Sequence, residues 1–181
     1  LDAIAELQAE MPRFDHRTVL HHFGVTTQAQ SRRAAALGCA VQANGYYLRF
    51  FGDQYVAEGL GTERASQMTR VGSARRNGMS VALHSDLPMG PLEPFLTAST
   101  LATRTSGLVA VIDVHARPSP HLALDAVTIA PALQRLLCID TGSLAPDLQA
   151  RVPTPRPHPS TVILSLLSDP TIQATLRCGR L

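Results

Sequence analysis

The chain has 181 residues, of which 45% are hydrophobic and 17% charged, and its formal net charge is +2. No stretch approaches the ~20 uninterrupted apolar residues of a bilayer-spanning helix, and the sixteen basic residues, all arginine, are scattered among fourteen acidic ones, so neither a membrane nor a nucleic-acid partner is expected. The three cysteines show no CxxC spacing, which argues against a disulfide framework or a zinc ribbon and favours a reducing, cytoplasmic compartment.

The first element that the sequence predicts is a helix over residues 1–11. Leu1, Ile4, Leu7 and Met11 recur at helical spacing and so share one face. No residue that favours an N-cap precedes them, and the chain starts at leucine rather than methionine. We therefore expect the chain to be a C-terminal fragment of a longer protein.

Strands and helices then alternate along the chain. The expected strands cover residues 18–22, 39–43 and 79–84, and the expected helices cover residues 27–37, 62–77 and 92–104. Thr27 with Gln30 has the form of a capping box, and Gly38 is a typical helix stop. Residues 44–61, which hold most of the aromatic side chains, are expected to form a loop.

The order of these elements predicts an α/β fold with a parallel sheet and crossover helices. An open doubly wound sheet and a closed eight-stranded barrel both fit that order. The glycine fingerprint of a dinucleotide-binding open sheet is missing after the first expected strand. A complete barrel takes about 250 residues, so three strands would supply part of one.

Asp86 is the strongest candidate for a chemical role. It follows a buried strand and precedes the turn residues 87–91, which is how barrel enzymes place a catalytic acid at the carboxyl end of a strand. His21 and His22 end another expected strand, and parallel strands bring such ends to one edge. Structural roles are the alternatives: a helix N-cap for Asp86 and hydrogen-bonded packing for either histidine.

Several motifs in this order resemble the amidohydrolase superfamily, specifically the family 3 branch with its N-substituted formamide deformylase-like enzymes. The motifs are TVLHHFGVTT at 18–27, Tyr46-Tyr47, Gly52-Asp53, LGTERA at 60–65 and HSDLPM at 84–89. The resemblance covers roughly residues 1–145 and favours the barrel over the open sheet.

The resemblance implies a metal-dependent TIM (β/α)8 barrel, of which this chain would be the last three β/α units with C-terminal helices and a short tail. Residues 1–145 would form the C-terminal part of the barrel, with a late helix over residues 122–137. Residues 146–181 would form a divergent proline-rich tail. Residues 161–167 in that tail could supply one strand of the family's small β-sandwich.

The resemblance also implies the chemistry of the site. His21 would bind a divalent metal, expected to be zinc, and Asp86 would serve as a second ligand and as general base for a metal-activated water. The reaction would be hydrolysis of a non-peptide carbon–nitrogen bond, such as an amide or formamide, in a small-molecule substrate. His84, Tyr46 and Tyr47 would contact that substrate, unless they are simple packing residues, while His22 would be structural.

Some expected ligands are missing from the sequence. The chain has no His-x-His pair and no lysine, so it supplies at most two of the family's metal ligands, and a catalytic zinc usually needs three. We therefore expect this chain by itself to be inactive. The alternative function is an inactive remnant that acts as a non-catalytic interaction module. Open sheet edges in a partial barrel also predict self-association.

Overall fold

The computed structural model describes residues 1–106, 117–135, 151–156 and 171–177, the last two ranges as backbone. Its elements in chain order are α1 (Asp2–Glu10), β1 (Val19–His22), α2 (Gln28–Ala36), β2 (Ala40–Asn44), α3 (Tyr46–Gln54), the π-helical turn η1 (Tyr55–Gly59), α4 (Gly61–Ser66), α5 (Val71–Arg76), β3 (Val81–His84), α6 (Pro94–Thr103), α7 (Pro120–Asp125), α8 (Ile129–Gln134), β4 (Arg151–Arg156) and β5 (Thr171–Arg177).

The first three strands form a parallel sheet in the order β1-β2-β3, which confirms the expected parallel α/β arrangement. In the register, His22 lies opposite Ala43, and Asn44 lies opposite His84. The strands therefore end within one residue of one another at their carboxyl edge. That alignment brings the residues that follow each strand to the same place.

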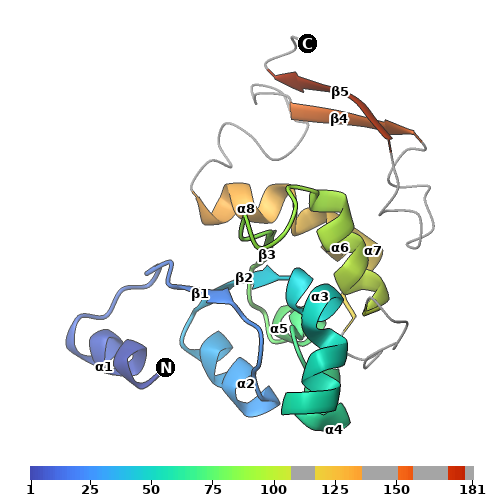
Figure 1. The fold of residues 1–181 in the computed structure, drawn as a ribbon. Coiled ribbons are helices and arrows are strands. Elements are labelled where there is room, and N and C mark those ends of the chain that lie inside the picture. Colours follow the sequence, from blue (N-terminus) through green and yellow to red (C-terminus); the bar gives the residue numbers. More distant parts are fainter. Residues whose placement is uncertain (107–116, 136–150, 157–170, 178–181) are drawn as a thin grey trace.

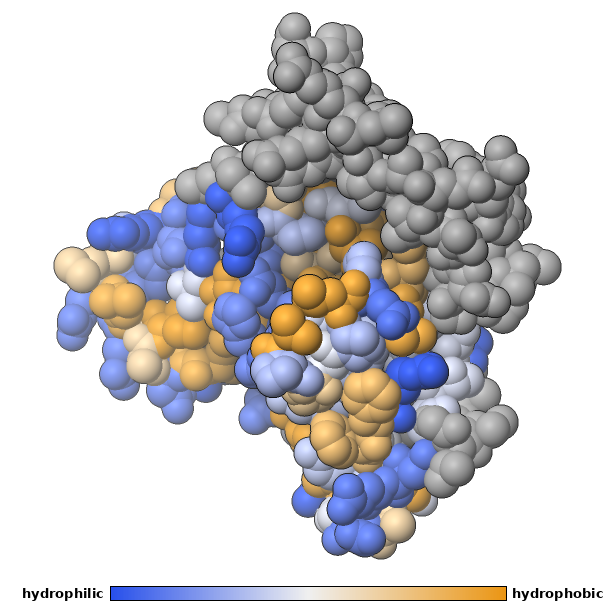
Figure 2. All heavy atoms as spheres, turned by 45° about the horizontal axis from the view of Figure 1, so that its top comes forward, coloured by the Kyte–Doolittle hydropathy of each residue, from blue (hydrophilic) through white to orange (hydrophobic). Residues whose placement is uncertain are grey.

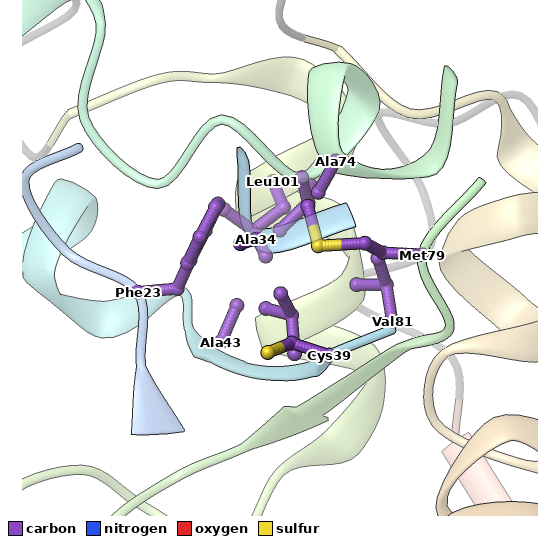
Figure 3. Close-up of a cluster of buried hydrophobic side chains, with 10 residues drawn as sticks. Phe23, Ala34, Cys39, Ala43, Ala74, Met79, Val81 and Leu101 are labelled. Carbon is purple, nitrogen blue, oxygen red and sulfur yellow. The ribbon is translucent and has the colours of Figure 1, made fainter. Parts of the chain in front are cut away.

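One face of the sheet packs against helices α2, α5 and α6. Buried Val41, Ala43 and Val81 contribute to an apolar cluster with Ala34 of α2 and Leu101 of α6 (Figure 3). Burial of apolar area, worth about 25 cal/mol per Å², holds the helices on this face. These apolar contacts hold the sheet against the three helices.

Helix α8 lies on the other side of the sheet from α2 and α5 (Figure 1). The Nε2 of Gln134 in α8 donates to the carbonyl of Val41, at 3.1 Å, and contacts the hydroxyl of Ser80 at the same distance. A cavity of about 350 Å³ lies beside these residues, at the amino-terminal end of the strands.

The start of α2 confirms the expected capping box. The Thr27 hydroxyl accepts from the backbone N–H of Gln30, and the Gln30 side chain accepts from the backbone N–H of Thr27. Gly38 adopts φ 75° after the helix, a left-handed conformation that glycine takes without steric cost.

The expected loop over residues 44–61 is wrong, because α3 and η1 occupy most of it. The Asn44 side chain accepts from the Tyr46 N–H at 2.9 Å and so begins the helix directly after β2. Along α3, Tyr46 stacks on Phe50 with ring centroids 5.2 Å apart, and Tyr47 lies 6.4 Å from Phe51. These pairs are four residues apart, so they stabilise a helix.

Two expected helices are each interrupted. The helix over residues 62–77 is divided into α4 and α5, and Thr69 between them has φ 45°. The fully buried Arg104 binds the carbonyls of Ser66, Met68 and Thr69 in this break. The helix over residues 122–137 is likewise divided into α7 and α8.

Near the carboxyl terminus, β4 and β5 pair antiparallel, with a register shift between Pro153 and Pro155. Proline cannot donate to the ladder, which accounts for an irregular strand here. The strand expected at 161–167 and the boundary expected at 145/146 lie outside the described residues. Among the described helices, none has the length and apolar character needed to cross a membrane.

On the face shown in Figure 2, hydrophobic groups form separate patches among hydrophilic ones. Large apolar side chains with more than half of their surface exposed are Leu7, Met11, Phe14, Val25, Leu87 and Leu92. Exposed apolar groups of this kind are compatible with self-association, which remains a prediction.

Candidate metal centre

Three potential metal ligands meet at the carboxyl edge of the parallel sheet. His22 ends β1, His84 ends β3, and Asp86 follows two residues later. One ligand atom from each residue lies within 4.8 Å of the others. Two imidazole nitrogens and a carboxylate oxygen are ligands that zinc and other divalent transition metals accept.

Left-handed backbone at two strand ends shapes this cluster. His22, Phe23 and Asp86 have φ values of 66°, 49° and 57°, which non-glycine residues seldom adopt. Adjacent residues of a regular strand point to opposite faces, but the turn at His22 leaves both neighbouring imidazoles near His84. The ring centroids of His21 and His22 lie 5.8 and 5.1 Å from that of His84.

His22 contacts an acid and a phenol. Its Nδ1 lies 3.6 Å from the Asp86 carboxylate and 3.3 Å from the hydroxyl of Tyr47. Burial, and then the negative charge of Asp86, raise the pKa of Tyr47, so the phenol keeps its proton. The Tyr47 oxygen can accept a hydrogen bond from an Nδ1–H of His22, which orients the ring and leaves the other ring nitrogen as the one able to bind a metal.

His84 is suited to bind a cation. Burial, followed by the charge of His22, lowers the pKa of His84, so its ring is neutral near pH 7, which is the form that binds metals. Its Nε2 is buried and has no hydrogen-bond partner among the described residues. A buried nitrogen without a partner is costly, and a metal ion would satisfy it. The residues present thus fit a divalent metal.

The candidate site residues expected from the sequence differ in their burial and in whether they belong to the metal-ligand cluster. Asp86 and His84 lie in the cluster, and His21 is exposed beside it. Tyr47 is half-buried next to His22, while Tyr46 is fully buried. The metal role of His21 and the substrate contacts of His84, Tyr46 and Tyr47 stay predictions.

Sequence reasoning missed His22 as a candidate ligand. The sequence predicted a structural role for His22, whereas the strand ends at His22 in a left-handed turn and its ring lies with His84 and Asp86. For His84 the sequence did contain a signal of a shared site, because His84 lies two residues before Asp86 at the same strand end.

A family model described as the amidohydrolase family matches residues 1–150. Among solved structures, the chain is similar to an uncharacterized metal-dependent hydrolase from Pyrococcus horikoshii, with a TM-score of 0.66 and 20% identity over 81% of this chain and 29% of that one. It is similar to an uncharacterized metal-dependent hydrolase from Pyrococcus furiosus, with a TM-score of 0.62 and 20% identity over 78% of this chain and 28% of that one.

A third similar structure is an adenosine deaminase from Xanthomonas campestris with bound zinc. Its TM-score is 0.61 at 16% identity, over 99% of this chain and 42% of that one. At these identities the similarity shows the fold. The chain spans less than a third of the length of the two Pyrococcus hydrolases. No curated protein matches the chain significantly.

Proposed function

Because the chain belongs to the amidohydrolase family, we propose that it forms part of a metal-dependent hydrolase that cleaves non-peptide carbon–nitrogen bonds such as amides or formamides. The observation that carries this proposal is the convergence of His22, His84 and Asp86 at the carboxyl edge of a parallel sheet. Barrel enzymes hold their active sites at that edge. In the same proposal, the three β/α units are part of a TIM barrel, and the segment beyond residue 145 is a separate tail.

His22, His84 and Asp86 would hold a divalent metal, most simply zinc, with His21 as a further candidate beside them. When bound, such a metal lowers the pKa of water toward ~7 and polarises a substrate carbonyl. The similar Xanthomonas structure with bound zinc supports this choice of metal.

The chain's own residues have definite tasks in such a reaction. Asp86 would accept a proton from the attacking water and transfer it to the leaving nitrogen, which must be protonated before it departs. Because burial lowers the pKa of His84, its imidazole is neutral near pH 7, and a ring nitrogen can donate a lone pair to the metal without first losing a proton. Tyr47 would hold the His22 ring in one orientation and border the space that a substrate enters.

A zinc titration by calorimetry, with the bound metal counted by mass spectrometry, tests the proposal. We expect the parent chain to bind zinc, and we expect His22→Ala, His84→Ala and Asp86→Ala each to weaken binding at least tenfold. His121→Ala is the matched control, because His121 is an exposed histidine on α7. His21→Ala decides whether that residue also contributes.

Loss of zinc binding in the cluster variants should accompany loss of amine release from N-formyl and N-acyl aromatic amines wherever the parent shows turnover. Zinc binding that is unchanged in Asp86→Ala would refute the proposed centre. A parent chain that folds but takes up no zinc would instead favour the non-catalytic interaction module.

A further inference from the structure

Tyr46 joins α3 to the segment that carries Asp86. The side chain is fully buried, and its hydroxyl lies 3.1 Å from the carbonyl oxygen of Pro91 and 3.2 Å from that of Glu93, within donating distance of both. Both carbonyls belong to residues 85–93, which connect β3 to α6 and which we call the Asp86 loop. The first residue of α3 thus holds a loop that follows β3.

Gly90 lets the Tyr46 ring lie against the bare backbone of this loop. A Cβ on Gly90 would overlap Cδ2 of Tyr46 and would lie 2.7 Å from its Cε2 and 2.9 Å from the carbonyl oxygen of Ser85. Real Cβ atoms do not approach so closely, so any side chain here would displace the ring or the loop. The backbone of Gly90 is not left-handed, so its conformation alone would accept another residue. The close contacts of this position are what require glycine.

The Asp86 backbone needs such external support. A left-handed φ of 57° is uncommon for a non-glycine residue, although aspartate adopts it more readily than most, and contacts from the surrounding structure help to hold it. Inside the loop, the Met89 N–H donates to the Asp86 carbonyl at 2.7 Å and closes the turn. The contacts of Tyr46 with Gly90, Pro91 and Glu93 then fix the far end of that turn.

We infer that Tyr46 is a positioning residue, which holds the Asp86 loop so that the Asp86 carboxylate faces His22 and His84. The inference rests on the proposed metal centre and assigns Tyr46 a different task from the substrate contact expected from the sequence. Tyr46 acts through the loop, because its ring is buried beneath it and its hydroxyl is engaged by loop carbonyls.

Two variants test this inference: Tyr46→Phe, which removes only the hydroxyl, and Gly90→Ala, which displaces the ring. Thr100→Val is the control, because the buried Thr100 hydroxyl also bonds one carbonyl, that of Leu96, but lies within α6 and away from the loop. The readouts are the zinc dissociation constant, the visible spectrum with Co²⁺, and hydrogen exchange of residues 85–93 without metal. None of them requires turnover.

We expect Tyr46→Phe to raise the zinc dissociation constant three- to tenfold, to alter the cobalt spectrum and to speed exchange within the Asp86 loop. Gly90→Ala should have a larger effect in the same direction, and Thr100→Val should change the dissociation constant less than twofold. A zinc dissociation constant within twofold of the parent in Tyr46→Phe, or equal weakening of zinc binding in Thr100→Val, would overturn this inference and leave the proposed function standing. A parent chain without zinc binding overturns the proposed function and, with it, this inference.

Discussion

A side chain on Gly45, between β2 and α3, would be crowded by α6. A Cβ there would lie 3.1 Å from Cγ of Leu101 and 3.2 Å from both Cγ2 and the carbonyl oxygen of Thr97. Its backbone, at φ −70° and ψ −23°, suits any L-residue, so a substitution meets only steric resistance. We expect Gly45→Ala to lower the free energy of unfolding by about 1–2 kcal/mol, the usual cost of overpacking.

Leu101 provides the test of that explanation, because it is fully buried and supplies the closest of the three contacts. Leu101→Ala alone should cost about 2–5 kcal/mol. In the double variant the two costs should fall short of additivity by about 1 kcal/mol, since truncation of Leu101 relieves part of the crowding. The Thr97 contacts remain, so the relief is incomplete.

Urea unfolding followed by circular dichroism measures these free energies. Gly59→Ala is the control, because a Cβ at Gly59 would meet its nearest neighbour, a ring carbon of Tyr55, at an ordinary 3.6 Å. It should change stability by less than about 0.5 kcal/mol. A neutral Gly45→Ala, or full additivity with Leu101→Ala, would refute the crowding argument.

Three further predictions use the same unfolding assay or chemical labelling. Arg104→Lys should cost about 2–4 kcal/mol, because lysine cannot reproduce the guanidinium fork on the carbonyls of residues 66–69, and a loss below about 0.5 kcal/mol would contradict this role. Thr27→Ala should cost about 0.5–2 kcal/mol by removing the capping box, while Thr27→Ser should be close to neutral. Burial raises the pKa of the Cys39 thiol, so folded protein at pH 8 should alkylate at Cys39 far more slowly than urea-unfolded protein. The same shift means that stability falls as the pH rises above the pKa of the unfolded thiol, and equal labelling rates with and without urea would contradict the burial.

Local sequence signals predicted the parallel sheet, but they failed at the connection after β2. Strand periodicity, the capping box at Thr27 and the glycine at position 38 act within a few residues, so they can be recognised without tertiary contacts. The run of aromatics from residue 46 to residue 55 was interpreted as a loop. Their spacing of four residues, as in Tyr46 and Phe50, was the helical signal.

The candidate site was only partly predictable, for a related reason. Asp86 and His84 follow from strand-end position, which the sequence displays. The placement of His22 depends on left-handed backbone at a strand end, and the role inferred for Tyr46 depends on contacts with a loop 45 residues away. Such features arise from the folded chain as a whole and leave no periodic pattern.

The paired histidines at the end of β1 have a consequence for how this chain tolerates change. A slip of β1 by one position relative to β2 would exchange the faces of its side chains, and in most strands it would remove a ligand from its site. In one direction the slip would carry His21 to the register position of His22, opposite Ala43, so an imidazole would still follow the strand there. The tolerance is one-sided, because a slip in the opposite direction would bring Phe23 to that place and remove the imidazole.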